Sequence, residues 1–196
     1  MKRKRMLALA LALAAVLCTG CGVKEEDLKS DPLVNEDGTA PVGNTLIAPA
    51  PQDPFVLLDN KDILSANGLY YASWVSGEPQ PYENSDGETV DLYDAQLTLV
   101  VQENKTEAKA ASAVSGWKEL AQQNYRITDT RTLTAAGQEY TVIQFDYLSE
   151  NNPYATGVAA FAQRGISAIE WELSCQDSYS GNALEVMVDF LNGCVY

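Results

Sequence analysis

Glu170 and Glu172 are the two residues whose types and spacing come nearest to a catalytic pair. They alternate with Ile169, Trp171 and Leu173, and this period of two predicts a β-strand in which both carboxylates point to one face. Strand geometry places them about 7 Å apart, within the roughly 5–9.5 Å that glycosidases use. The surrounding sequence offers no obvious neighbour that would separate their pKa values. We therefore expect a solvent-facing polar strand, with hydrolysis by this pair as the alternative.

The chain contains no histidine, which narrows the chemistry available to it. Serine and cysteine nucleophiles that depend on a histidine base are excluded, and the commonest ligand of zinc and copper is missing. The acidic stretch 86–94 offers oxygen ligands, but aligning Gly87 with the sixth position of an EF-hand loop puts Tyr82 first and Tyr93 twelfth. We predict a solvated loop there, no metal or other cofactor, and no enzymatic activity.

Residues 1–20 have the layout of a secretory signal peptide. Residues 2–5 are all basic, and residues 6–17 form an unbroken apolar run. That run has 12 residues, whereas a membrane-spanning helix needs about 20. We therefore expect export and removal of this segment.

The end of the signal segment resembles a bacterial lipobox. Thr19 and Gly20 stand directly before Cys21, although Cys18 occupies the position where a lipobox usually carries leucine. The resemblance implies cleavage before Cys21 and its lipidation with acyl chains such as palmitate. An ordinary signal peptide cleaved nearby and an uncleaved anchor are the alternatives. We expect a lipoprotein anchored on the extracytoplasmic face of the cell membrane.

The charge balance limits the partners of this chain. It carries 27 acidic against 13 basic residues, a net charge of −14, and four of the basic residues lie in the signal segment. Nucleic-acid binding depends on Lys and Arg that neutralise phosphates, so no nucleic acid is expected. Adsorption to anionic lipid is disfavoured for the same reason, so membrane attachment must come from the lipid anchor.

Two cysteines remain after lipidation, Cys175 and Cys194. An even pair in an exported domain is typical of a disulfide. However, a helix over residues 180–192 would span about 20 Å, and a disulfide needs Cα atoms within about 7 Å. A disulfide and two separate buried thiols therefore both remain open.

The chain divides into the signal peptide 1–20, a tether 21–54 and one domain 55–196. The tether is polar and rich in proline, so it cannot bury enough apolar surface to fold alone. In the domain, alternating residues predict strands and apolar stripes predict helices. Strands are expected over 69–75, 95–101, 138–148, 155–163 and 169–173, a hairpin over 132–138, and helices over 106–124 and 180–192. This order predicts an α+β fold, an antiparallel sheet with two main helices packed on it.

Aromatic residues are the remaining candidates for a binding site. Tyr and Trp are enriched in interfaces, and we predict a binding surface at Tyr70, Tyr82 and Tyr154. Trp117 and Trp171 fall on apolar stripes and are expected in the core.

The domain resembles the PsbP-like superfamily, which includes bacterial lipoproteins of the DcrB and LpqN type. The likeness rests on residues 68–71, the helix over Trp117, residues 137–140 entering a strand, the run 154–161, and the strand 166–175 before a closing helix. It implies an α/β/α sandwich without a shared catalytic apparatus, and it transfers no functional residue.

Together these features predict a non-catalytic binding or assembly module for an envelope protein. The alternative is a ligand-binding lipoprotein for a glycan, peptide or small molecule.

Overall fold

A computed structural model describes residues 34–64, 68–84, 87–149 and 152–196. The signal segment and Cys21 lie outside these ranges. The strands are β1 (Ala40–Val42), β2 (Leu46–Ala48), β3 (Phe55–Leu64), β4 (Leu69–Ser76), β5 (Gln80–Glu83), β6 (Thr89–Leu92), β7 (Ala95–Glu103), β8 (Tyr125–Ala135), β9 (Gln138–Tyr147), β10 (Thr156–Arg164) and β11 (Ser167–Cys175); the helices are α2 (Glu107–Asn124) and α3 (Ala183–Gly193).

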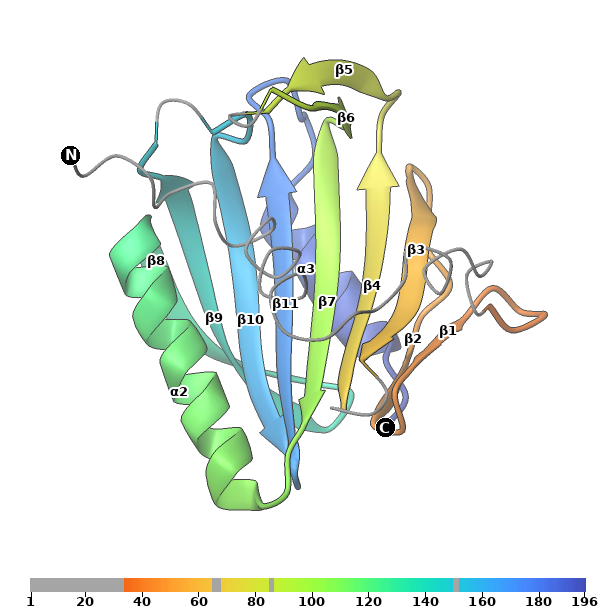
Figure 1. The fold of residues 1–196 in the computed structure, drawn as a ribbon, viewed down its shortest axis with the longest axis vertical. Helices are drawn as coiled ribbons and strands as arrows, with labels where there is room; N and C mark the ends of the chain where they lie inside the picture. Colours follow the sequence, from red (N-terminus) through yellow and green to blue (C-terminus); the bar gives the residue numbers. More distant parts are fainter. Residues whose placement is uncertain (1–33, 65–67, 85–86, 150–151) are drawn as a thin grey trace.

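Seven strands form one sheet in the order β3-β4-β7-β11-β10-β9-β8, and every neighbouring pair is antiparallel (Figure 1). Two short hairpins, β1–β2 and β5–β6, form separate two-stranded sheets. The predicted antiparallel sheet with two main helices is therefore confirmed. No helix in the described part of the chain is long and apolar enough to span a membrane.

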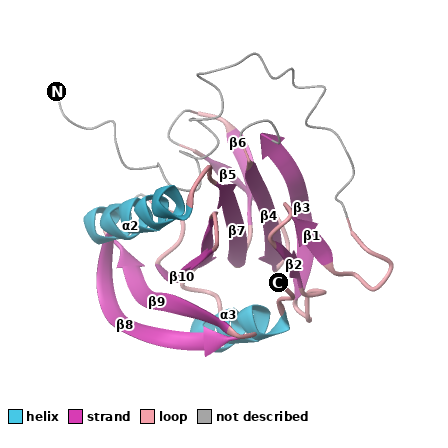
Figure 2. Cartoon of the chain, turned by 90° about the horizontal axis from the view of Figure 1, so that it is seen from below, coloured by secondary structure: helices cyan, strands magenta, loops and turns pink. Residues whose placement is uncertain are grey.

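The two helices lie on opposite faces of the sheet (Figure 2). Alternate residues of a strand point to opposite faces. Trp74 and Trp171 point to the α3 side, where their rings stack with centroids 5.6 Å apart. Phe145 and Phe161 point to the α2 side and pack with Val114 of α2. The central strand β11 is consequently buried along its whole length.

Both helices begin at polar caps. Thr106 caps α2 by accepting a hydrogen bond from the Lys109 backbone N–H. Asn182 caps α3 by accepting from two backbone N–H groups. On α2, Trp117 is only partly buried against the apolar cluster, whereas Trp171 is fully buried as predicted.

The described part of the predicted tether, residues 34–54, differs from a flexible linker. Ala40, Val42, Leu46 and Ala48 are at most 3% exposed and belong to the same apolar cluster as α3. The β1–β2 hairpin is also tied to the end of the chain, because the backbones of Ile47 and Val195 exchange hydrogen bonds. The domain therefore begins before residue 55.

Cys175 and Cys194 are both free and buried, so the structure has the two separate thiols rather than the disulfide. Cys175 ends β11, and Cys194 follows the far end of α3. An 11-residue helix is about 16 Å long, and the chain does not fold back to bring the two residues together. The Cys194 thiol instead donates to the Phe190 carbonyl oxygen at 3.3 Å.

Candidate functional site

Glu172 lies at the centre of a buried hydrogen-bond cluster on the α2 side of the sheet. Its Oε2 accepts a hydrogen bond from the Tyr125 hydroxyl at 2.8 Å, and its Oε1 accepts from the Tyr147 hydroxyl at 2.9 Å. Ser174 also donates to Oε1, at 3.3 Å, and its hydroxyl lies 2.6 Å from that of Tyr147. Both carboxylate oxygens therefore have protein donors.

Small residues on β10 let the two tyrosines reach Glu172 from the edge of the sheet. Gly157 lies beside Phe145 in the register of β9 and β10, and a Cβ at residue 157 would collide with the Phe145 ring. The Tyr125 ring stacks on Phe145 with centroids 3.9 Å apart. Ala159 is the β10 neighbour of Glu172, so no large side chain separates the tyrosine hydroxyls from the carboxylate.

Glu170 is equally buried but lacks the partners of Glu172. Glu170 and Glu172 are 5% and 6% exposed, so the expectation of a solvent-facing strand is wrong. No described residue donates a hydrogen bond to Glu170. Burial, reinforced by the nearby charge of Glu172, raises the pKa of Glu170 to about 8. Glu170 is therefore mainly a neutral carboxylic acid at pH 7.

Burial also raises the pKa of Glu172, although the hydroxyl donors from Tyr125, Tyr147 and Ser174 oppose this effect. The pKa values of both tyrosines are raised by burial, so they remain protonated donors. Glu170 is thus a neutral acid near Glu172 but outside its hydrogen-bond cluster, whereas both oxygens of Glu172 accept hydrogen bonds. This arrangement connects β8 and β9 to β11, and we assign it no catalytic step.

The three tyrosines of the predicted binding surface do not lie together. Tyr70 is at the start of β4 and packs against Gly43 in the β1–β2 turn. Tyr82 lies on β5, beyond the other end of β4. Tyr154 precedes β10 at that same end, and its hydroxyl donates to Gln96 at 3.2 Å. All three are partly buried, so they do not form one exposed aromatic face.

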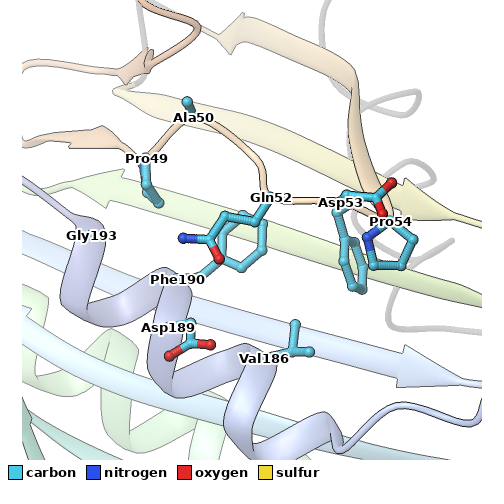
Figure 3. Close-up of a pocket in the computed structure, with 10 residues that line it drawn as sticks. Pro49, Ala50, Gln52, Asp53, Pro54, Val186, Asp189, Phe190 and Gly193 are labelled. Carbon is cyan, nitrogen blue, oxygen red and sulfur yellow. The ribbon is translucent and has the colours of Figure 1, made fainter.

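A pocket lies between α3 and the segment before β3 (Figure 3). It has a volume of about 120 Å³. The residues that line it are Pro49, Ala50, Gln52, Asp53, Pro54, Phe55, Val186, Asp189, Phe190 and Gly193.

The lining of the pocket is divided into a buried floor and an exposed rim. Phe55 and Phe190 are 4% and 5% exposed, and their rings meet edge to face at 5.8 Å. Gln52 and Asp53 on the linker and Asp189 on α3 are exposed, and Figure 3 shows the linker and the helix on opposite sides of the pocket. The pocket therefore offers apolar contact inside and polar groups at its mouth.

Close packing at Gly193 forms one end of this pocket. A Cβ on Gly193 would lie 2.6 Å from the Pro49 Cβ, so only glycine lets the linker approach the end of α3 this closely. Sequence reasoning missed the pocket because it placed residues 49–54 in a tether. The signal present in the sequence is the alternation of Ala40 with Val42 and of Leu46 with Ala48, which indicates short strands before the linker.

Among the described residues, no group of three or more Cys, Asp or Glu side chains is placed to hold a metal ion. The acidic stretch expected to be a loop is partly the β5–β6 hairpin, and residues 85–86 lie outside the described ranges.

Comparison with known proteins identifies no family for this chain. No family model matches it, and no curated protein matches it. Among solved structures it is similar to cyanobacterial PsbP (CyanoP) from Synechocystis sp. PCC 6803, with 12% identity over 67% of this chain and 89% of that one, at a TM-score of 0.36. It is also similar to PA94 from Pseudomonas aeruginosa, described as a putative regulator of unknown function, with 11% identity over 52% and 85% of the two chains and a TM-score of 0.33. One structural neighbour is thus a PsbP protein.

Proposed function

We propose that this chain is a lipoprotein of the extracytoplasmic membrane face whose PsbP-like α/β/α domain, of the DcrB and LpqN type, binds an envelope protein without catalysing a reaction. The signal segment and the lipobox-like residues before Cys21 support the anchor. Two acyl chains on one cysteine would hold the protein stably, whereas one chain binds a membrane only marginally. The domain would then present its pocket to other proteins of the envelope.

The observation that carries this proposal is the size and lining of the pocket at α3. Sites for drug-sized ligands measure about 300–1,000 Å³, whereas this pocket measures about 120 Å³. A cavity of about 150 Å³ accommodates benzene, so the pocket fits one side chain. Protein interfaces concentrate their binding energy in such anchor side chains, each seated in a pocket. The volume therefore favours a protein partner over a glycan or a larger small molecule.

Site-specific photo-crosslinking in native membranes tests the proposal. A photoreactive residue replaces Gln52 at the rim of the pocket, and a control chain carries it at Glu119, which is exposed on α2. We expect one dominant protein adduct from position 52 and none from position 119. Val186→Phe, which adds a ring inside the pocket, should abolish that adduct. Equal labelling from both positions, or an adduct that survives Val186→Phe, would overturn the proposal.

A further inference from the structure

We infer that the side chain received by the pocket at α3 is basic, an arginine or lysine of the partner protein. This inference rests on the proposed function and specifies the chemistry of the same site. Three separate features of the pocket support it: its two carboxylates, the end of the helix that lines it, and its apolar floor.

The first feature is a pair of carboxylates at the mouth. Asp53 is on the linker and Asp189 is on α3, and both line the pocket. No residue within the described ranges forms an ion pair or a hydrogen bond with either side chain. Two acidic groups at the rim that no described residue pairs favour a cationic group in the pocket, because opposite charges attract each other even near a protein surface.

The second feature is the C-terminal end of α3. Phe190 and Gly193 of its last turn line the pocket. The last carbonyl groups of a helix carry partial negative charge, which favours cations near this end. The last turn of α3 holds no basic residue of its own. A cationic group from a partner would supply the charge that the helix end lacks.

The third feature is the floor beneath these charges. The buried rings of Phe55 and Phe190, with the partly buried Val186, form an apolar surface below the exposed carboxylates. Lysine and arginine bury their methylene stems against apolar surface while the charged group stays at a polar boundary. A pocket with an apolar floor and carboxylates at its rim matches that distribution.

Removing the two charges tests the inference in the full-length protein in native membranes. The double variant Asp53→Asn and Asp189→Asn keeps side-chain shape and removes only charge. We expect the yield of the position-52 adduct to fall about tenfold, since each ion pair at an interface rim contributes modestly. The matched control, Asp177→Asn with Glu185→Gln, removes two exposed carboxylates outside the pocket lining and should leave the yield unchanged.

A competition experiment separates charge from shape. Nα-acetyl-arginine amide should suppress the adduct, whereas Nα-acetyl-citrulline amide, its neutral isostere, should not at the same concentration and ionic strength. If Val186→Phe abolishes the adduct but the double Asn variant and both competitors leave it intact, the pocket binds a protein through a side chain that is not basic, and this inference fails alone. If Val186→Phe has no effect either, the proposed function fails with it.

Discussion

Tyr125 donates a 2.8 Å hydrogen bond to Glu172, although Tyr125 begins the edge strand β8 and Glu172 lies in the central strand β11. The bond passes over β9 and β10, where Gly157 and Ala159 leave room for it. It is one of three hydroxyl donors to the same carboxyl group. Glu172 therefore holds one half of the sheet together through side chains as well as through backbone hydrogen bonds.

Glu172→Ala should destabilise the domain by about 3 kcal/mol, because it leaves the buried hydroxyls of Tyr125 and Tyr147 without their acceptor and creates a cavity. Chemical denaturation monitored by tryptophan fluorescence would measure the loss. Glu119→Ala on the exposed side of α2 is the control and should change stability by less than about 0.5 kcal/mol. A loss no larger than that of the control would show that the cluster does not connect the strands.

Glu170→Gln should change how stability depends on pH. Glu170 has a raised pKa of about 8 in the folded protein, so the folded state keeps a proton that the unfolded chain releases above its ordinary pKa near 4.5. The contribution of Glu170 to the free energy of unfolding is fully present below the ordinary pKa near 4.5. This contribution is lost as the pH rises from there toward about 8. The slope across this window is up to about 1.4 kcal/mol per pH unit.

Denaturation of the wild type and of Glu170→Gln at several pH values from 5 to 8 would test this expectation. As the pH rises, the wild type should lose stability relative to the Glu170→Gln variant. A difference independent of pH would mean that Glu170 is ionised in the folded protein throughout, which contradicts its burial beside Glu172.

Gly157→Ala should destabilise the domain by about 1–3 kcal/mol through overpacking. The new Cβ would collide with the Phe145 ring and lie 2.7 Å from the Leu173 carbonyl oxygen. Gly116→Ala is the control, since it lies within α2 with nothing within 4 Å of its Cβ position, and it should stabilise by up to about 1 kcal/mol. Thermal denaturation of both variants measures the contrast, and equal effects would contradict the close packing at Gly157.

The Cys175 and Cys194 thiols should resist alkylation in the folded protein. Burial raises the pKa of each to about 12, and the thiolate is the reactive form. Mass spectrometry after treatment with N-ethylmaleimide at neutral pH should find neither labelled. Both should react after unfolding without a reductant. Failure to react under those conditions would reveal a disulfide.

Cys21→Ser should abolish acylation of the protein, because it removes the thiol to which the lipid is expected to be attached. Metabolic labelling with a clickable palmitate analogue should mark the wild type and leave the variant unlabelled. Equal labelling of the wild type and of Cys21→Ser, or no labelling of the wild type, would refute lipidation at Cys21.

Local sequence patterns predicted most of the domain. The strands β4, β7, β9, β10 and β11 and both helices lie within a few residues of the predicted ranges, because each has a clear period of two or an apolar stripe. The hairpin β5–β6 was not predicted, because each of its strands has only four residues, which is too short for a period of two to be recognised.

Local sequence patterns did not predict the burial or the hydrogen-bond partners of Glu170 and Glu172. Alternation correctly placed both on one face of a strand, but it assigned that face to solvent. The central position of β11 and the packing of α2 on that face bury both sides of the strand. The tyrosine donors come from β8 and β9, 47 and 25 residues away in sequence, and no local pattern predicts that approach.

Sequencing the peptide that crosslinks to position 52 in native membranes would identify what the pocket at α3 holds. We predict a peptide from one envelope protein, with an arginine or lysine next to the attachment point. A peptide without a basic residue there would contradict the role of Asp53 and Asp189, and recovery of a glycan or a small molecule in place of a peptide would contradict protein binding by this pocket.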